Sequence, residues 1–394
     1  MFVEELTTAN QFMVTLLAVV LALAVGALLV IIADEDARGA WSYLFADPLE
    51  ALSFSWYAVR DAYVALFEGA IFDPSSLSSG NATLIFGPIS ETLTYTAPLI
   101  FTGLSVALAF RAGLFNIGAE GQVIFGAIFG ALVGFSVPLP YGLHLIFALL
   151  AAAVGGALWG FIPGILKART GAHEVITTIM LNYIAGIFLV WLVTQPGVQD
   201  PNRTDAISKK IDATADLPNL AGEVLRVNLA IVLAIIATVG VSWLLNRSTF
   251  GFELRAVGAN PDAARTAGMS ISKSYILVMV VAGALAALGG GSVLLGTAQA
   301  LTPAVSANIG FDGITVALLG RARPWGVVGA ALLIGALQAG AVKMQATAGI
   351  PIDMVNVLQA LIVLFIAAPA LIKAVFRLRP DTSERAETAL AKGW

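Results

Sequence analysis

The amino-acid sequence predicts an all-α, polytopic membrane protein. Hydrophobic residues make up 58% of the 394 residues and charged residues only 12%, with a mean hydropathy of +0.89. An ordinary soluble domain has about a quarter of its residues charged, so this composition excludes that class. The apolar stretches also run for about 20 residues without the period-two alternation of a membrane β-barrel, which leaves transmembrane helices.

Apolar segments account for roughly ten expected membrane spans. The first covers residues 11–32, and we expect it to be retained because Glu4 and Glu5 stand where a signal peptide would carry basic residues. The run at residues 314–320 is too short to cross a membrane alone. The remaining expected spans are residues 84–110, 113–135, 143–166, 175–193, 228–245, 275–296, 326–346 and 354–374.

A short polar motif occurs twice within these apolar surroundings. It reads Asn-Ile-Gly-Ala-Glu-Gly at residues 116–121 and Asn-Ile-Gly-Phe-Asp-Gly at residues 308–313. Glycine and a mid-membrane carboxylate both disfavour an uninterrupted lipid-facing helix, by about 1 and about 2.5–3.5 kcal/mol respectively. Two such copies predict a duplicated membrane unit with a broken or half helix in each repeat, an arrangement that places a site near the bilayer centre.

These features divide the chain into three parts. Residues 1–83 hold the first span and an aromatic-rich, extracytoplasmic interfacial segment. Residues 84–379 form the membrane core, with repeat one at about 84–195 and repeat two at about 228–379. Residues 380–394 form a cytoplasmic tail.

The distribution of Lys and Arg predicts the orientation. Most of the 21 basic residues adjoin short loops that alternate along the chain, for example Arg111, Lys167, Arg247 and Arg321. The positive-inside rule places these loops, and with them both termini, in the cytoplasm. The first copy of the motif then enters from the cytoplasmic side and the second runs toward it, so the two repeats are expected to be inverted.

The motif residues are the candidates for a translocation path. Asn116 and Asn308 offer both donors and acceptors, and Gln122 follows the first copy. Glu120 and Asp312 fit two roles equally well: they either hydrogen-bond a polar substrate or cap the start of a half helix. Other chemistry has little support, because the sequence has no cysteine, two histidines and no G-x-x-x-x-G-K-[ST] phosphate loop. We therefore expect no catalytic residue, metal or cofactor.

Residues 258–268 carry start and stop signals for a helix, which predict a short cytoplasmic helix. Asn260 and Pro261 form a start signal and Gly268 a stop signal. A helix of about seven residues is unstable alone in water, so it must dock on a partner surface. The residues assigned to this coupling role are Gly258, Asn260, Ala263, Ala264, Arg265 and Gly268.

Three stretches resemble ABC importer permeases of the branched-chain amino acid, ribose and nucleoside group. Residues 263–268 resemble their coupling helix, and residues 113–122, Gly-Leu-Phe-Asn-Ile-Gly-Ala-Glu-Gly-Gln, resemble their core motif. Residues 171–183, Gly-Ala-His-Glu-Val-Ile-Thr-Thr-Ile-Met-Leu-Asn-Tyr, are similar to the longer of the two permeases in bacterial nucleoside importers. The resemblance covers about residues 84–379, which makes them the permease core.

This resemblance implies a multi-pass subunit of the bacterial cytoplasmic membrane that moves nucleosides inward by alternating access. It implies a second, shorter permease as a heterodimeric partner, a cytoplasmic ABC ATPase and an extracytoplasmic substrate-binding lipoprotein, with no nucleic acid. Two alternatives remain open on the residues alone. One is an ion-coupled secondary transporter that uses Glu120, Asp312 or Glu174, and the other is a passive channel.

Overall fold

The computed structural model describes residues 11–222 and 224–378, which fold as helices without a named β-strand. Eight of the described helices are long and apolar enough to cross a membrane. A ninth span results if α15 (Asp353–Ala367) and α16 (Pro369–Val375), bent by 88° at their junction, count as one. The all-α, polytopic prediction is confirmed. The number is slightly below the expected ten because α13 (Ile309–Leu319) is too short to span.

The chain forms two compact units. Unit 1 comprises the described parts of Met1–Gly69 and Leu337–Trp394, and unit 2 comprises Ala70–Ala336. Helix α14 (Pro324–Ala348) contributes to both. The predicted boundaries at residues 83 and 379 stay predictions, and the predicted tail lies outside the described residues.

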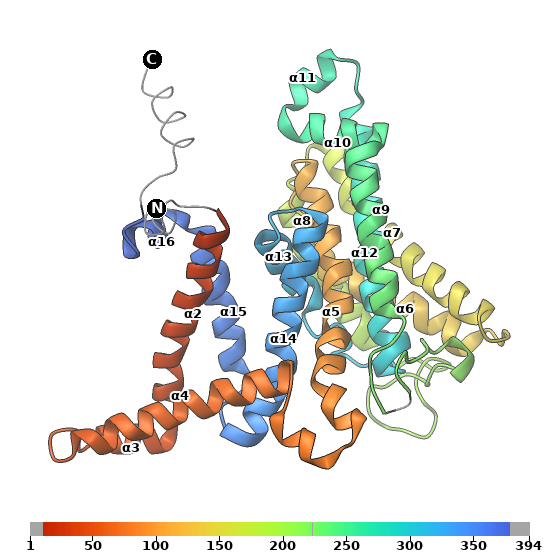
Figure 1. Ribbon diagram of the computed structural model, residues 1–394. Helices are drawn as coiled ribbons and strands as arrows, with labels where there is room; N and C mark the ends of the chain where they lie inside the picture. Colours follow the sequence, from red (N-terminus) through yellow and green to blue (C-terminus); the bar gives the residue numbers. More distant parts are fainter. Residues whose placement is uncertain (1–10, 223, 379–394) are drawn as a thin grey trace, which may run out of the picture. The chain divides into compact units, whose positions relative to one another are not determined.

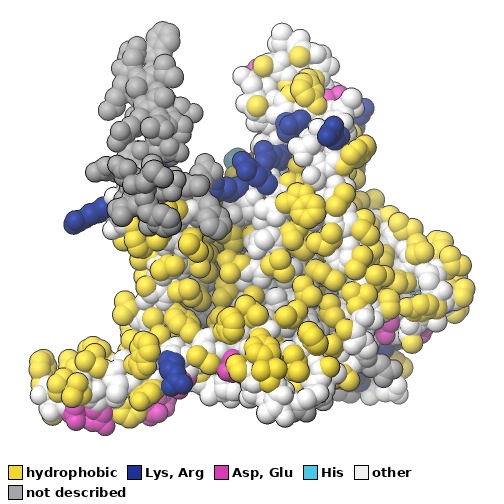
Figure 2. Space-filling model, in the orientation of Figure 1, with side chains coloured by type: hydrophobic (Ala, Val, Ile, Leu, Met, Phe, Trp, Pro, Cys, Tyr) yellow, Lys and Arg dark blue, Asp and Glu magenta, His cyan; other side chains and the backbone are white. Residues whose placement is uncertain are grey.

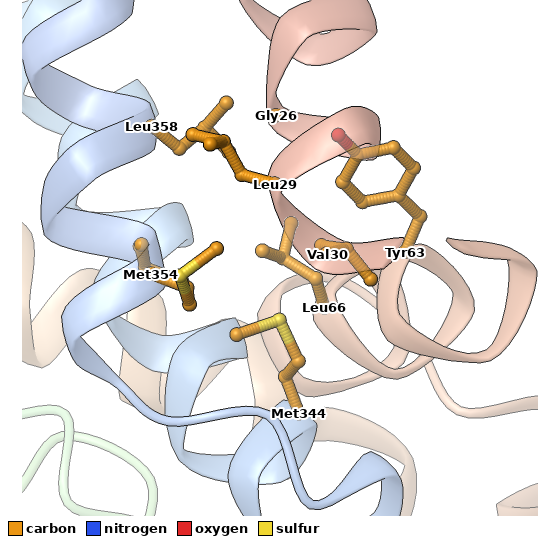
Figure 3. Close-up of a pocket in the computed structure, with 9 residues that line it drawn as sticks. Gly26, Leu29, Val30, Tyr63, Leu66, Met344, Met354 and Leu358 are labelled. Carbon is orange, nitrogen blue, oxygen red and sulfur yellow. The ribbon is translucent and has the colours of Figure 1, made fainter. Parts of the chain in front are cut away.

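Unit 1 is built on α2 (Gln11–Ala33), against which α15 and α16 pack. Helix α3 (Glu35–Trp41) follows α2 directly. In Figure 1, α4 (Pro48–Ala70) lies across α2. The Tyr63 hydroxyl of α4 donates to the carbonyl of Leu23 at 2.5 Å. Figure 3 shows side chains from α2, α4, α14 and α15 converging on an apolar cavity of only about 10 Å³, so this junction is closely packed.

Unit 2 has its core where four long helices meet. They are α5 (Ala82–Arg111), α6 (Ala119–Ser136), α7 (Leu143–Thr170) and α12 (Ile271–Val293), and α12 continues as a π-helical turn, Leu294–Ala298. Helix α12 packs against the other three. At the α7–α12 contact the backbones nearly touch, because a Cβ on Gly156 or Gly160 would collide with α12. Close approach through small residues is typical of membrane helix pairs.

Helices α5 and α12 run in opposite directions through unit 2. Helix α5 begins near the polar segment, where Ser90 Oγ accepts from the Val227 amide at 2.9 Å. It ends beside α10 (Thr249–Ala259), where Gly113 meets Gly258. Helix α12 begins near α10 and ends where its Leu295 carbonyl accepts from the Leu217 amide at 2.8 Å. These are the helices that precede the two motif copies, and their opposite directions are what an inverted repeat requires.

The polar segment, residues 195–229, is an ordered cap on one end of unit 2. Its amides donate to carbonyls of unit 2, for example Asp212 to Gly134 near the end of α6 at 2.8 Å and Ser208 to Leu301 in the loop before α13 at 3.0 Å. His144 at the start of α7 is buried and links Thr214 to the Val133 carbonyl. The opposite end carries α10 and α11 (Pro261–Thr266), and Figure 2 shows Lys and Arg side chains gathered there.

Two helices complete unit 2. Helix α8 (Glu174–Leu192) packs on α6 and α7, and α9 (Ala230–Arg247) packs on α5 and α10. Most of the α8 surface is exposed in the described chain, including the large apolar side chains of Ile176, Met180, Ile184 and Ile187. An apolar helix with this much exposed surface needs lipid or another protein around it.

Candidate translocation site

The two copies of the motif meet at the centre of unit 2. The amide of Gly310 donates to Oε2 of Glu120 at 2.8 Å, although the two residues are 190 positions apart. A Cβ on Gly310 would overlap the backbone of Glu120, so the starts of α6 and α13 touch directly. The packing is reciprocal, because α13 lies on α5 while α6 lies on α12. Glycine in the second copy is required by this approach.

Glu120 caps the start of α13 from the other repeat. Its side chain is 6% exposed, and the Ser306 side chain and the amides of Asn308 and Phe311 also face its carboxylate. The first amides of a helix have no partner within the helix, and a negative charge there is favourable. The capping role weighed for Glu120 therefore has a geometric basis, and the same carboxylate also reaches a cavity.

Asn116 and Gln122 form a buried pair that braces the first copy. Each is 1% exposed. The Asn116 amide donates to Gln122 Oε1 at 2.9 Å, and the Gln122 amide donates back to Asn116 Oδ1 at 3.2 Å. The two side-chain amides therefore fulfil each other's hydrogen bonds, as buried polar groups generally do. Neither side chain lines the cavity of the translocation site.

Asn308 and Asp312 differ from their counterparts in the first copy. Asn308 is exposed, lines the cavity and has a left-handed backbone with φ +64°. Asparagine tolerates this conformation better than most residues. Asp312 is half-buried and lies outside the cavity lining. Of the five predicted path residues, the structure brings Glu120 and Asn308 to the cavity.

The cavity has a volume of about 860 Å³ and lies between α6, α8 and the segment that leads into α13. It follows α8 from Ile179 to Thr194, which is roughly 20 Å at 1.5 Å per residue. Its polar groups are few, as in most small-molecule sites. They come from Glu120, Asn182, Thr194, Ser306 and Asn308, while Tyr183, Trp191 and Phe311 supply aromatic surface.

Asn182 of α8 ties this wall to the first copy of the motif. Its Oδ1 accepts from the Gly121 amide at 2.9 Å, and its amide donates to the Ile117 carbonyl at 2.9 Å. Sequence reasoning did not assign Asn182 a role. A signal existed, because an amide side chain in the middle of an apolar span needs a hydrogen-bond partner. Tyr183, Trp191, Ser306 and Phe311 were missed because nothing local in the sequence marks them.

A row of aromatic rings supports the α8 wall. Phe125 of α6 stacks on Trp159 of α7 with ring centroids 3.7 Å apart. Phe125 also stacks with Phe188 of α8, with ring centroids 5.6 Å apart. The Trp191 ring lies 5.5 Å from that of Phe188. Stacked aromatic pairs add about 0.5–1.5 kcal/mol each beyond their burial. The row therefore holds α6, α7 and α8 together along the cavity.

The predicted cytoplasmic helix is present as α11. Oδ1 of Asn260 accepts from the Asp262 and Ala263 amides at 3.1 and 3.0 Å, and Pro261 is the first helical residue. Gly268 follows with φ +85°, as a glycine stop predicts. The sequence reading missed α10, the 11-residue helix in front of it, and placed only a turn at its end.

The predicted docking face needs one correction. Ala263 and Arg265 are exposed, but Ala264 is only 3% exposed, so it packs within the chain and is not available to a partner. The other five residues of α11 are exposed, so Ala264 marks the side by which this short helix packs on the rest of the chain. Gly258 is also internal, because a Cβ there would collide with the Arg111 carbonyl and Gly113.

A permease family matches most of the chain. The family described as "Branched-chain amino acid transport system / permease component" covers residues 89–367. The chain belongs to this family. It is therefore a permease component, a transport subunit rather than an enzyme, and the resemblance seen in the three motifs is confirmed.

The chain is similar to several ABC transporter permeases. It is 38% identical to the guanosine permease NupP of Bacillus subtilis over 93% of this chain and 96% of the relative. It is 43% identical to the nucleoside permease NupB of Lactococcus lactis over 73% and 81%, and 36% identical to the glucose permease TsgB13 of Haloferax volcanii over 71% and 75%. No solved structure matches the chain.

This family membership does not favour the ion-coupled alternative. Two of the three carboxylates proposed for it are also engaged: Glu120 caps α13, and Oε2 of Glu174 lies 2.8 Å from Nζ of Lys167. The Glu174 pair joins the start of α8 to the end of α7, where an acid at a helix N-terminus and a base at a C-terminus are both favourable. As an ABC transporter permease, the chain works with partner chains.

Proposed function

We propose that the chain is the membrane permease of an ATP-driven importer that carries nucleosides into the cell by alternating access. The proposal of nucleosides as the substrate rests on the match to the guanosine permease NupP, which extends over nearly the whole of both chains. The nucleoside permease NupB supports the same class at 43% identity, and the glucose relative matches a similar share of the chain at 36% identity.

The cavity supports this substrate class. Its volume of about 860 Å³ exceeds what a nucleoside needs and falls within the usual range for ligand sites of about 300–1,000 Å³. Tyr183, Trp191 and Phe311 offer aromatic surface to a base, and stacking on a base contributes about 1–3 kcal/mol in other proteins. Glu120 and Ser306 offer hydrogen-bonding groups to ribose hydroxyls.

A second permease would complete the site. The α8 wall is open, because Tyr183, Ile187 and Trp191 are 68%, 71% and 54% exposed in this chain alone. Ligand sites usually bury 70–90% of a small ligand, so another surface must cover this side during transport. A shorter, related permease in a heterodimer is the partner that the family resemblance implies.

The basic end of unit 2 supports the orientation with both termini in the cytoplasm. Arg111, Arg255, Arg265 and Arg321 lie at the end that carries α10 and α11. The polar segment then faces outward, where a substrate-binding lipoprotein would deliver the nucleoside. With no native cysteine, Lys209→Cys should react with an impermeant thiol reagent on intact cells and Asp262→Cys should not. The reverse labelling would overturn this orientation.

The ATPase contact is proposed for the exposed side of α11, with Ala263 and Arg265. Asn260 and Gly268 shape the helix ends, while Gly258 and Ala264 attach it to the permease. Ala263→Glu should leave the protein in the membrane but reduce co-purification of the ATPase and ATP-dependent uptake. Lys209→Glu, in the polar segment, is the matched control. Equal ATPase recovery from both variants would contradict the coupling role.

Uptake tests the proposed substrate. Cells with this gene should take up labelled guanosine, and cells without it should lose that uptake. Unlabelled nucleosides should compete, while glucose, free ribose and branched-chain amino acids should not. Competition by glucose with no effect of nucleosides would move the substrate class to sugars. Uptake that collapses with a proton uncoupler while ATP is maintained would overturn ATP-driven transport.

A further inference from the structure

Helices α3 and α4 form an arm in unit 1, residues 35–69, that precedes the family match beginning at residue 89. Nε1 of Trp41 donates to the Ser55 hydroxyl at 2.8 Å and joins the two helices. Small buried side chains, including Ala37 and Ala51, lie on their inner faces. The arm is therefore an ordered element of the fold, and its outer surface carries exposed side chains.

Helix α4 has three different faces. Ala51, Ser55, Ala62 and Ala65 are buried and recur at helical spacing on the side that packs within the chain. A second side carries large, exposed apolar residues, and a third carries acids. The apolar side consists of Leu49, Leu52, Trp56 and Phe67, which are 77%, 57%, 65% and 52% exposed. The acidic side carries Glu50 and Asp61, which are exposed, and Glu68 at its end pairs with Lys343 of α14 at 2.8 Å.

The apolar side of the arm is the side that is turned toward α2. Figure 2 shows acidic side chains along the edge of the arm that is turned away from α2, with apolar side chains on the edge toward α2. Helix α2 exposes Leu16, Val20, Leu28 and Ile32 by 48–63%, so its own surface needs a lipid environment. A bilayer that holds α2 therefore also meets the apolar side of α4.

The depth of the crossing matches a membrane interface. Tyr63 and Leu66 of α4 line the same small cavity as Gly26 and Val30 of α2 (Figure 3). Since α2 ends at Ala33, the crossing lies roughly 5–10 Å from its end at 1.5 Å per residue. Interfacial helices bury their apolar face about 5–10 Å into the boundary between headgroups and acyl chains.

We propose that this arm is an interfacial anchor whose partner is the lipid surface itself. Leu49, Leu52, Trp56 and Phe67 insert at the headgroup boundary, while the acidic side faces water. Acids outnumber bases on the arm, with Glu35, Asp36, Asp47, Glu50, Asp61 and Glu68 against Arg38 and Arg60. The anchor therefore depends on apolar burial and prefers zwitterionic lipid, unlike basic amphipathic helices that need anionic headgroups.

Spin labels on single cysteines test the anchor in the full-length chain, which has no native cysteine. Leu52→Cys and Trp56→Cys probe the apolar side, and Glu50→Cys and Asp61→Cys serve as matched sites on the acidic side. In phosphatidylcholine vesicles the first pair should collide with dissolved oxygen and the second pair with a water-soluble nickel chelate. Nickel access at all four sites would place the arm in water and overturn the proposal.

The same labels separate lipid from a protein partner. Oxygen access at residues 52 and 56 should be equal for the chain alone and for the assembled transporter. Loss of access to both reagents only in the assembled transporter would show a protein cover and overturn the proposal. An oxygen signal that appears only when anionic phosphatidylglycerol is added would also contradict it, because the arm is acidic.

A charge placed on the apolar side supplies a second test. With a label at Leu49→Cys, the added change Trp56→Asp should lift the arm and exchange oxygen access for nickel access. Tyr57→Asp adds the same charge beside Glu50 and Asp61 on the acidic side and should leave the label unchanged. An unaltered oxygen signal in the Trp56→Asp protein would contradict the anchor, whatever its effect on transport.

Discussion

The two copies of the Asn-Ile-Gly motif have almost the same sequence but different surroundings. In the first copy Asn116 is 1% exposed and paired with Gln122, and Glu120 is 6% exposed. In the second copy Asn308 is exposed with a left-handed backbone, and Asp312 is half-buried. The first copy is an internal brace, whereas the second presents its asparagine to the cavity.

The difference arises where the copies touch. The Glu120 carboxylate of the first copy accepts a hydrogen bond from the Gly310 amide at the start of α13 in the second, at 2.8 Å. The start of α6 follows a loop that Asn182 and the Asn116–Gln122 pair hold in place. Duplicated sequence therefore gives an asymmetric pair, with one copy supporting the other.

The largest effect is expected at the contact itself. Gly310→Val places a branched side chain against the backbone of Glu120, which cannot move aside as a flexible side chain could. Overpacking that forces backbone shifts costs about 1–3 kcal/mol and occasionally more, and a clash with backbone on both sides belongs at the high end. Thermal unfolding of the purified protein in detergent should show a large loss of stability, together with loss of uptake.

Gly329→Ala is the matched control for Gly310→Val, since nothing lies within 4 Å of the added Cβ. Alanine in a helix is favoured over glycine by about 1 kcal/mol, so this variant should be as stable as the native chain or slightly more so. If both glycine variants unfold at the native temperature, the close approach of the two copies is wrong.

The acids of the two copies should differ in importance. Glu120→Ala leaves a buried helix-start amide without its acceptor, which costs about 1–3 kcal/mol, and removes a polar group from the cavity. Asp312→Ala should cost less stability and less uptake, because Asp312 is half-buried and outside the cavity lining. Labelled guanosine uptake, scaled to the amount of protein in the membrane, measures both variants.

Glu120→Gln separates the two roles of this carboxylate. It keeps an oxygen for the Gly310 amide but removes the charge, so stability should be largely retained. Reduced uptake in this variant would assign the charge to transport, and native uptake would leave only the capping role. A greater loss from Asp312→Ala than from Glu120→Ala would reverse the comparison between the copies.

Substitutions at the two asparagines should separate stability from transport. Asn116→Ala strips Gln122 of its buried partner and should lower the free energy of unfolding by about 1–3 kcal/mol. Asn308→Gly fits the left-handed backbone and should change stability by less than about 1 kcal/mol. Unfolding and uptake measured on the same samples compare the two.

The loss of uptake per folded protein should be larger for Asn308→Gly than for Asn116→Ala, the opposite of the order for stability. Asn308 lines the cavity, so Asn308→Gly should reduce guanosine uptake without unfolding the protein. Asn116→Ala should reduce uptake only in proportion to the folded protein that remains. Normal uptake in Asn308→Gly would remove this side chain from the translocation path.

Local signals were sufficient for much of the fold. Long apolar runs predicted the spans because burial in lipid needs about 20 residues whatever the neighbours are. Asn260, Pro261 and Gly268 predicted α11 because caps act on amides within three residues of them. Helix α10 was missed because its 11 residues have no comparable stop signal before Asn260.

The sequence by itself determined the membrane class, the duplicated motif and the permease family, since each depends on composition or on a contiguous pattern. Only the tertiary structure decided that Glu120 caps α13, that Asn116 is enclosed while Asn308 is exposed, and that Ala264 faces inward. The physical reason is distance along the chain. Packing between residues as far apart as 190 positions selects which polar groups meet, and no period or cap in the sequence specifies that choice.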